Sequence, residues 1–181
     1  MIIKTERLIL RPWKKTDAKS LYEYAKDPRV GPLAGWPVHT SEDESAKVIT
    51  DILSAPETYA VCLKDDNIAI GSVALKAPGQ TYIKSNNETE IGCWIGVPFW
   101  GHGYIPEAVK ALINRAFKDL NYKGVWYGYY DGNDKSKRCS QKCGFKYHHK
   151  EMNKECSLLN EIRDEHYTYL SKDEWVKNIK G

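Results

Sequence analysis

The amino-acid sequence predicts one α+β domain with a mixed, mostly antiparallel central sheet and flanking helices. Two β-rich runs, residues 58–64 and 68–76, are separated by a short polar turn, which is typical of an antiparallel hairpin. Residues 105–120 repeat apolar side chains with a period near 3.6, which predicts a helix. This helix lies between predicted strands at residues 90–97 and 124–130. A strand–helix–strand unit implies one parallel strand pair in the sheet.

The N-terminal part begins with a predicted strand at residues 7–13, with alternation around Leu8, Leu10 and Pro12. We expect Thr16 to cap a helix that runs through Lys26. The glycines and prolines of residues 29–40 predict a loop. Ser41 and Glu44 have capping-box spacing and predict the start of a second helix. The apolar face of that helix is Val48, Ile49, Ile52 and Leu53.

The remaining elements follow from shorter signals. Residues 81–89 are polar and predict a loop before the central strand. Asn133 is expected to open a short helix, followed by strands at residues 144–148 and 162–170 and by a capped helix starting at Ser171–Glu174. The sequence has no internal repeat, low-complexity tract or linker, so residues 1–181 are expected to form a single domain.

Composition excludes several classes of protein. Of the 181 residues, 41% are hydrophobic and 28% charged, as in ordinary globular proteins, and the net charge of +3 comes without a basic stripe. We therefore expect no nucleic-acid partner. The apolar runs are too short to span a membrane, and charges within the first ten residues argue against a signal peptide. The expectation is a cytoplasmic protein, monomeric or homodimeric.

The five cysteines are an odd number and come without an export signal, which indicates reduced thiols. Cys139 and Cys143, followed by His148 and His149, raise the alternative of a zinc site. Their spacing differs from the usual zinc knuckle. Two buried helix cysteines and two surface histidines are the favoured interpretation, so no metal is expected.

A glycine pair precedes the long helix in the segment PFWGHGYIPEA. Helix N-termini bind anions through unpaired N–H groups, and Gly101 and Gly103 would leave the backbone bare for a phosphate. A P-loop lysine is absent, and Pro106 occupies the third position of a dinucleotide fingerprint. From spacing alone, a phosphate-binding loop and a plain tight turn both remain open.

Further residues favour a ligand near this loop. Gly92 and Gly96 interrupt the preceding strand, and glycine within a strand often marks a bulge or a close approach of a ligand. Asn133 and Ser136 have i, i+3 spacing at a helix start after the next strand. They are ordinary capping residues, but they would also present polar groups beside the glycine pair.

Three segments, in this order, carry a family resemblance: TERLILRPW, EIGCWIGVPFWGHGYIPEA and N..S.......GF from Asn133 to Phe145. Together they resemble the RimJ/RimL-type branch of the GCN5-related N-acetyltransferases (GNAT), and the resemblance extends from Thr5 to Trp175. It implies a GNAT-like sheet with a splayed parallel strand pair that holds acetyl-CoA. It also implies direct transfer of the acetyl group to a primary amine, either a protein N-terminus or a small molecule, in a ternary complex.

The resemblance also implies a set of cofactor-binding residues. The pantetheine arm would bond to backbone around Ile95 and Val97, and the Asn133 amide would hold it from the other side. The pyrophosphate would lie on the N–H groups of Gly101, His102, Gly103 and Tyr104. Pro98 and His102 depart from the residues that the family often has, which predicts weaker binding at worst because the backbone carries the contacts.

Acetyl transfer needs a neutral amine, an oxyanion donor and a proton for the leaving thiolate. Deprotonation at pH 7 costs about 1 kcal/mol for an α-amino group and about 4.6 kcal/mol for a lysine. Glu90 is the candidate base, through water, unless it is merely a solvated strand end; Glu155 or Glu161 are the alternatives. Ser136 is the candidate acid unless it only caps a helix. A backbone N–H near Val97 is the expected oxyanion donor.

The acceptor remains open at this stage. By resemblance, residues 31–40 with Trp36 form one wall of its pocket, and Trp94 and Tyr129 extend it. Ribosomal protein N-termini, polyamines, amino acids and antibiotics are all possible acceptors. Two other classes of function also remain: a non-catalytic acyl-CoA sensor, and an interaction domain of the same fold without a ligand.

Overall fold

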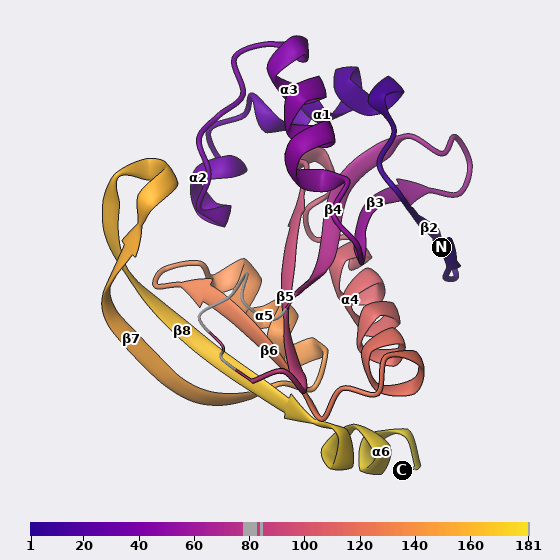
Figure 1. Cartoon of the computed structure of the whole chain (residues 1–181), viewed down its shortest axis with the longest axis vertical. Coiled ribbons are helices and arrows are strands. Elements are labelled where there is room, and N and C mark those ends of the chain that lie inside the picture. Colours follow the sequence, from indigo (N-terminus) through magenta and orange to yellow (C-terminus); the bar gives the residue numbers. More distant parts are fainter. Residues whose placement is uncertain (78–82, 84, 181) are drawn as a thin grey trace.

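The computed structural model describes residues 1–77, 83 and 85–180 and contains one eight-stranded sheet (Figure 1). The strands lie in the order β1-β2-β3-β4-β5-β6-β8-β7. Their bounds are β1 Ile3–Lys4, β2 Leu8–Arg11, β3 Thr58–Leu63, β4 Ala69–Lys76, β5 Glu88–Ile95, β6 Gly124–Tyr130, β7 Lys146–Cys156 and β8 Glu161–Ser171. Neighbouring strands are antiparallel except β5 and β6, which are parallel. The predicted mixed α+β fold is confirmed.

Six α-helices of the described chain surround this sheet. They are α1 Ala18–Ala25, α2 Gly31–Ala34, α3 Glu42–Val48, α4 Tyr104–Asn114, α5 Asp134–Lys142 and α6 Lys172–Lys180. α3 and α4 each end in a π-helical turn, Ile49–Leu53 and Arg115–Asp119. No helix in this part of the chain combines the length and the apolarity that crossing a membrane requires.

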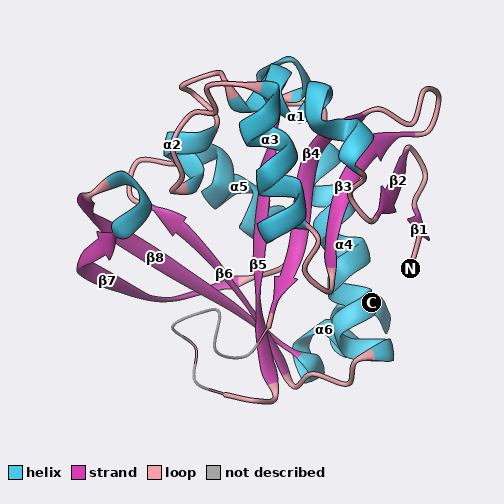
Figure 2. Ribbon diagram, turned by 45° about the horizontal axis from the view of Figure 1, so that its top comes forward, coloured by secondary structure: helices cyan, strands magenta, loops and turns pink. Residues whose placement is uncertain are grey.

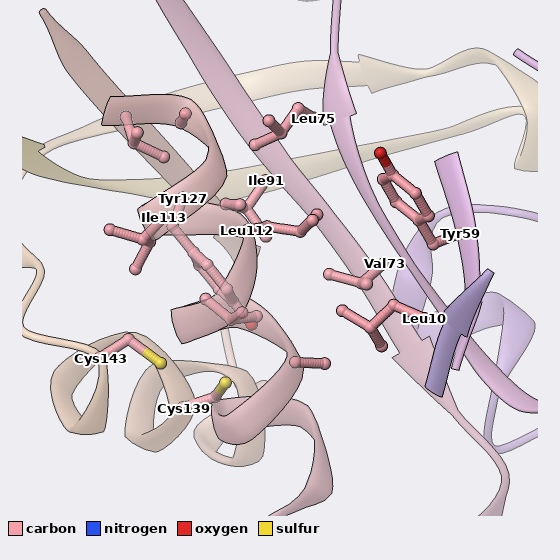
Figure 3. Close-up of a cluster of buried hydrophobic side chains, with 14 of the residues drawn as sticks. Leu10, Tyr59, Val73, Leu75, Ile91, Leu112, Ile113, Tyr127, Cys139 and Cys143 are labelled. Carbon is pink, nitrogen blue, oxygen red and sulfur yellow. The ribbon is translucent and has the colours of Figure 1, made fainter. Parts of the chain in front are cut away.

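The two faces of the sheet carry separate hydrophobic cores. Strand side chains alternate between faces, so Val61 joins the core under α4 and α5 while Ala60 joins the core under α1 and α3. Figure 3 shows the first core, where Leu112 and Ile113 of α4 lie among side chains from the strands and from α5. The helix predicted for residues 105–120 is confirmed as α4 and its π-helical turn, and its buried side chains join this core.

The sheet divides between β5 and β6. These strands pair only from Glu88–Gly124 to Ile91–Tyr127. Beyond this point β5 stays with β4 and β6 stays with β8, and Figure 2 shows the two strands running apart. The splayed parallel pair that the resemblance implied is therefore present.

Helix starts were predicted with mixed success. The Thr16 cap was wrong: a 3-10 turn, Lys15–Asp17, precedes α1, because the Asp17 carboxylate accepts from the Lys14 amide and pairs with the buried Arg11 guanidinium at 2.7 Å. At α3, Ser41 accepts from the Glu44 amide as predicted. The Glu44 carboxylate, however, bonds to Thr40 instead of completing the capping box.

Other boundaries also differ from the predictions. The loop at residues 29–40 contains α2. The strand expected at residues 144–148 extends to Cys156, because β8 pairs with it along its polar continuation. Of the loop predicted at residues 81–89, residues 81, 82 and 84 lie outside the described residues, and Glu88 and Thr89 already belong to β5. The short strand β1 was not predicted.

The cysteine–histidine cluster does not form the zinc site raised above. Cys139 of α5 and Cys143, the C-cap of this helix, are buried against the core, whereas His148 is exposed on β7. No group of three or more metal-ligating side chains occurs within residues 1–77, 83 and 85–180. The interpretation of these residues as buried thiols and surface histidines is confirmed for Cys139, Cys143 and His148, while His149 is half-buried.

Candidate active site

A cavity of about 390 Å³ opens where β5 and β6 diverge. Ile91, Cys93 and Tyr127 line it from the face covered by α4 and α5. Glu90, Trp94 and Gly128, which alternate with them along the strands, line it from the opposite face. Because both faces contribute, the cavity passes through the sheet.

Most of the predicted site residues meet at this cavity. Those that line it are Glu90, Ile95, Gly101, Gly103, Tyr104, Asn133 and Ser136. Val97 and His102 do not line it. The Val97 carbonyl closes a 3-10 turn by accepting from the Trp100 amide, and the Ile95 carbonyl already accepts from the Trp100 indole at 3.0 Å.

The glycine pair forms the start of α4. Gly101 has φ +82° and Gly103 has φ +79°, a left-handed conformation that side chains other than glycine rarely adopt. A Cβ on Gly101 would meet nothing within 4 Å, so backbone conformation rather than crowding requires these glycines. Gly103 is the N-cap of α4 and offers no side-chain cap. Open space therefore faces a helix N-terminus, which favours an anion.

The other two strand glycines have different roles. Gly92 lies in regular register with Ala74 of β4 and faces the cavity, without a bulge. A Cβ on Gly96 would lie 2.6 Å from the Tyr24 ring, so Gly96 makes room for that side chain. Of the two, only Gly92 lies where a ligand in the cavity would approach.

Asn133 caps α5 and also contacts the loop on the opposite face. Its Oδ1 accepts from the Ser136 amide at 3.1 Å, and its Nδ2 donates to the Leu33 carbonyl of α2 at 3.3 Å. Asn133 therefore joins the α5 side of the cavity to the α2 side.

Ser136 belongs to a partly buried hydrogen-bond chain. Its Oγ lies 2.9 Å from the Tyr127 hydroxyl, which lies 3.2 Å from the Cys93 thiol. Burial raises the pKa of Cys93 to about 12 and raises the pKa of Tyr127 well above its ordinary value. Both groups therefore stay protonated near neutral pH. Tyr127 was not singled out by sequence reasoning, because it looks like one tyrosine among several in an aromatic strand.

Two buried carboxylates line the cavity on the other face. Glu90 is 4% exposed and pairs with Lys76 at 2.5 Å. Glu165 of β8 is 8% exposed; its Oε2 accepts from Lys154 at 2.5 Å and from Tyr167 at 2.7 Å. The Oε1 atom of Glu165 lies against Gly128, 2.7 Å from where a Cβ would stand.

Glu165 is the carboxylate that sequence reasoning missed. The sequence shows only that Glu165 and Tyr167 lie on the same face of a strand. It does not show which strand is the neighbour, and so it does not place Glu165 at the cavity. Glu155 and Glu161, the alternatives named from the sequence, are exposed and do not line the cavity.

Helix α5 presents a basic face to the cavity. Lys135, Arg138 and Lys142, spaced i, i+3 and i+7, all line it, and the Lys135 ammonium lies 4.1 Å from the centre of the Trp100 ring. This face was also missed, because a lysine-rich helix is usually just a solvated surface.

On the opposite face, α2 forms a wall. Leu33 and Ala34 line the cavity, and Arg163 donates to the Pro32 carbonyl at 2.5 Å, which ties α2 to β8. Trp94 lines the cavity as expected. Trp36 lies behind it, edge-on at 5.6 Å. Tyr129 lines the cavity from the α5 face, where it packs in the core.

Comparisons with known proteins agree with this architecture. The profile of the Acetyltransferase (GNAT) domain matches residues 7–146. The uncharacterized N-acetyltransferase YnaD of Bacillus subtilis is 31% identical over 179 residues, covering 97% of this chain and 99% of YnaD. The uncharacterized N-acetyltransferase p20 of Bacillus licheniformis is 29% identical over 126 residues, covering 67% of this chain and 68% of p20.

Solved structures share the fold across nearly the whole chain. A GNAT-family acetyltransferase from Bacillus anthracis superposes with a TM-score of 0.83 at 25% identity, covering 96% of this chain and 100% of that one. The ribosomal-protein-S5-alanine acetyltransferase of Vibrio fischeri superposes with a TM-score of 0.74 at 19% identity, covering 97% and 98%. With the profile match and the YnaD identity, the conclusion is that the chain belongs to the GNAT family of N-acetyltransferases.

Proposed function

We propose that residues 1–181 form a single RimJ/RimL-type N-acetyltransferase domain that moves the acetyl group of acetyl-CoA directly to a primary amine. The observation that carries this proposal is the cavity through the split sheet. It has a left-handed glycine loop and a basic helix face on one side, and two buried carboxylates on the other. This arrangement suits an anionic donor entering from one face and an amine entering from the other.

The residues present fit acetyl-CoA. The N–H groups of residues 101–104 would hold its pyrophosphate, since the space in front of Gly101 is open and the helix dipole favours an anion there. Lys135, Arg138 and Lys142 would add positive charge beside the nucleotide. On the side of β5 that β6 leaves unpaired, the backbone around Ile95 would bond to the pantetheine amides once its carbonyl leaves the Trp100 indole. The Asn133 side chain would do so once it leaves Leu33.

Acetyl-CoA supplies a thioester whose carbonyl carbon is open to attack. On the amine side, Glu90 or Glu165 takes the proton from the ammonium, directly or through water, so that the amine attacks in its neutral form. As the C–N bond forms and the C–S bond breaks, Ser136 donates a proton toward the sulfur. The second proton, which the nitrogen loses on becoming an amide, returns through water to the Ser136 oxygen. Tyr127, which stays protonated, holds the Ser136 hydroxyl in place. A backbone N–H near Val97 is the proposed donor to the oxyanion.

The proposed setting is the cytoplasm. All five cysteines are free, and a reducing compartment keeps thiols in that state. The acceptor is proposed only as a primary amine. An α-amino group needs a weaker base than a lysine side chain does, since its deprotonation at pH 7 costs only about 1 kcal/mol.

A thermal melt with and without acetyl-CoA tests the proposal, with ATP and NAD as controls that carry phosphates but no thioester arm. Ligand at one hundred times its dissociation constant adds about 2.7 kcal/mol to the unfolding free energy. For a chain of this length the midpoint should rise by about 5–11 °C. Absence of a shift at millimolar acetyl-CoA would remove the proposed function together with every residue role assigned above.

A further inference from the structure

The turn between β1 and β2 lies against the glycine loop at the start of α4. Arg7, in this turn, donates from Nη1 to the His102 carbonyl at 2.9 Å. Its Nε donates to Glu107 at 2.7 Å, and its Nη2 pairs with the same carboxylate at 2.7 Å. The guanidinium also lies over the Tyr104 ring, 4.6 Å from its centre. One side chain therefore joins the loop to the first turn of α4.

Glu107 is held as a carboxylate in this arrangement. Besides Arg7, it accepts from the Thr5 hydroxyl at 2.6 Å and from the Arg7 backbone amide at 2.9 Å. Burial alone would raise its pKa, but these hydrogen bonds outweigh burial and lower the pKa. The anchor that positions the Arg7 guanidinium is thus ionised at neutral pH, and it is fixed at both oxygens.

The contact with the His102 carbonyl has a specific consequence. A peptide unit is planar and trans, so the His102 carbonyl and the Gly103 N–H belong to one plane and point in opposite directions. Arg7 binds the carbonyl outside the cavity, whereas Gly103 lines the cavity. Fixing the carbonyl therefore directs the Gly103 N–H toward the cavity.

The glycine loop, residues 101–104, needs an external contact to fix its peptide planes because glycine is conformationally free. Gly101 and Gly103 flank His102, and both populate positive and negative φ with similar ease. Without an external contact, the peptide plane between His102 and Gly103 could rotate. Arg7 supplies that contact from a segment nearly one hundred residues away.

We propose that Arg7 is a positioning residue for acetyl-CoA: it orients the His102–Gly103 peptide so that its N–H faces the pyrophosphate. This inference rests on the proposed function, because it assumes that the glycine loop holds the pyrophosphate. Arg7 does not itself line the cavity, so its effect passes through the loop.

The test compares two ligands in calorimetric titrations of the whole chain. Acetyl-CoA carries the pyrophosphate, whereas acetyl-pantetheine has the same thioester arm without it. Arg7→Met should weaken acetyl-CoA binding about tenfold, the effect of losing one charge-assisted hydrogen bond. It should leave acetyl-pantetheine binding within about twofold of wild type. Arg7→Lys keeps the charge beside Glu107 but cannot bridge Glu107 and His102 together. Its affinity for acetyl-CoA should therefore lie between those of wild type and Arg7→Met.

Lys64→Met is the matched control. Lys64 donates to the Glu6 carbonyl of the same turn at 2.8 Å but makes no contact with the glycine loop, so its loss should change neither affinity. Equal acetyl-CoA affinity in wild type and Arg7→Met would overturn the assignment, as would equal weakening of both ligands. If wild type itself bound no acetyl-CoA, the proposed function would fail instead.

Discussion

At the scale of single residues, the face of the cavity opposite α4 and α5 has two carboxylates where the sequence predicted one. Glu90 stands on β5 before the strands diverge, opposite Trp126. Glu165 stands on β8, with Oε1 lying over Gly128 just past the last paired residues. Lys76 holds Oε1 of Glu90, whereas Lys154 and Tyr167 hold Oε2 of Glu165. We expect Glu165 to be the base, because its Oε1 lies over Gly128, just past the last paired residues of β5 and β6.

We expect Glu165→Gln to lower kcat/KM by roughly 10²–10⁴-fold, the usual contribution of a general base. The acidic limb of its pH–rate profile should flatten, because the carboxylate whose ionisation produces that limb is gone. Glu90→Gln, which makes the same chemical change on the other side of the gap, is the matched control and should retain the limb. A retained limb in Glu165→Gln and a lost limb in Glu90→Gln would return the role of base to Glu90.

Ser136→Ala should lower turnover by about 10²-fold or more while the acetyl-CoA-induced rise in melting temperature persists. The cap of α5 survives this change, because Asn133 bonds the Ser136 backbone amide and not its hydroxyl. Ser140→Ala, in the same helix, removes a hydroxyl that, among the described residues, bonds to the Lys137 carbonyl alone, and it should leave turnover unchanged. Normal turnover in Ser136→Ala would exclude this serine as the proton donor.

Several site residues that the sequence predicted share one property: they stand in patterns that a short stretch of sequence contains in full. Gly101, Gly103, Asn133 and Ser136 stand in short motifs at helix starts, where spacing alone restricts the possible conformations. The residues that were missed depend on contacts between distant segments. Arg7 reaches His102 only after the sheet has formed, and Glu165 reaches the cavity only because β8 pairs with β6.

At the scale of elements, the amphipathic period and the hairpin spacing predicted helices and strands correctly, whereas polar or very short elements were missed or given wrong bounds. α4 shows an unbroken apolar face, so its prediction was confirmed. β7 is largely charged and exposed, and β8 holds it in the sheet through backbone pairing that leaves no mark on its composition. α2 has only four residues, too few for any period to show.

The packing of α1 against α3 has a pH-sensitive contact. The His39 amide donates to the Ala25 carbonyl at the end of α1, and Nδ1 of His39 lies 2.8 Å from the Ser45 hydroxyl of α3. Burial lowers the pKa of His39, and the charge of Glu44 opposes this only in part. The folded state therefore binds fewer protons than the unfolded state below the ordinary histidine pKa of about 6.5.

It follows that the contribution of His39 to stability is fully present above about pH 6.5 and is lost as the pH falls toward its lowered folded-state pKa. Urea unfolding at pH 7.5 and pH 5.5 should show a larger loss of stability in wild type than in His39→Gln. His148→Gln, at an exposed histidine on β7, serves as the control. Equal losses in wild type and His39→Gln would mean that other groups determine the acid sensitivity.

At the scale of the whole molecule, the sequence order of the strands nearly equals their order in the sheet. β1 to β5 follow one another as neighbours, and β6 to β8 form a second group in which only β7 and β8 exchange places. The fold class was predictable because the β3–β4 hairpin and the β5–α4–β6 unit are each formed by neighbouring segments of the sequence. The extent of the split between β5 and β6 was not predictable from hydrophobic pattern, because it depends on where backbone pairing stops.

That split gives the molecule two sheet edges in its interior. Past Ile91 and Tyr127, each strand keeps a partner on one side and has none on the side of the gap. Exposed edges usually invite pairing with other chains, but here they border the cavity between β5 and β6. A ligand bearing amide groups along its length would add to these edges as a strand does. Such a ligand would then connect the two halves of the sheet. The sheet would be continuous from β5 to β6 when the protein holds the group that it is about to transfer.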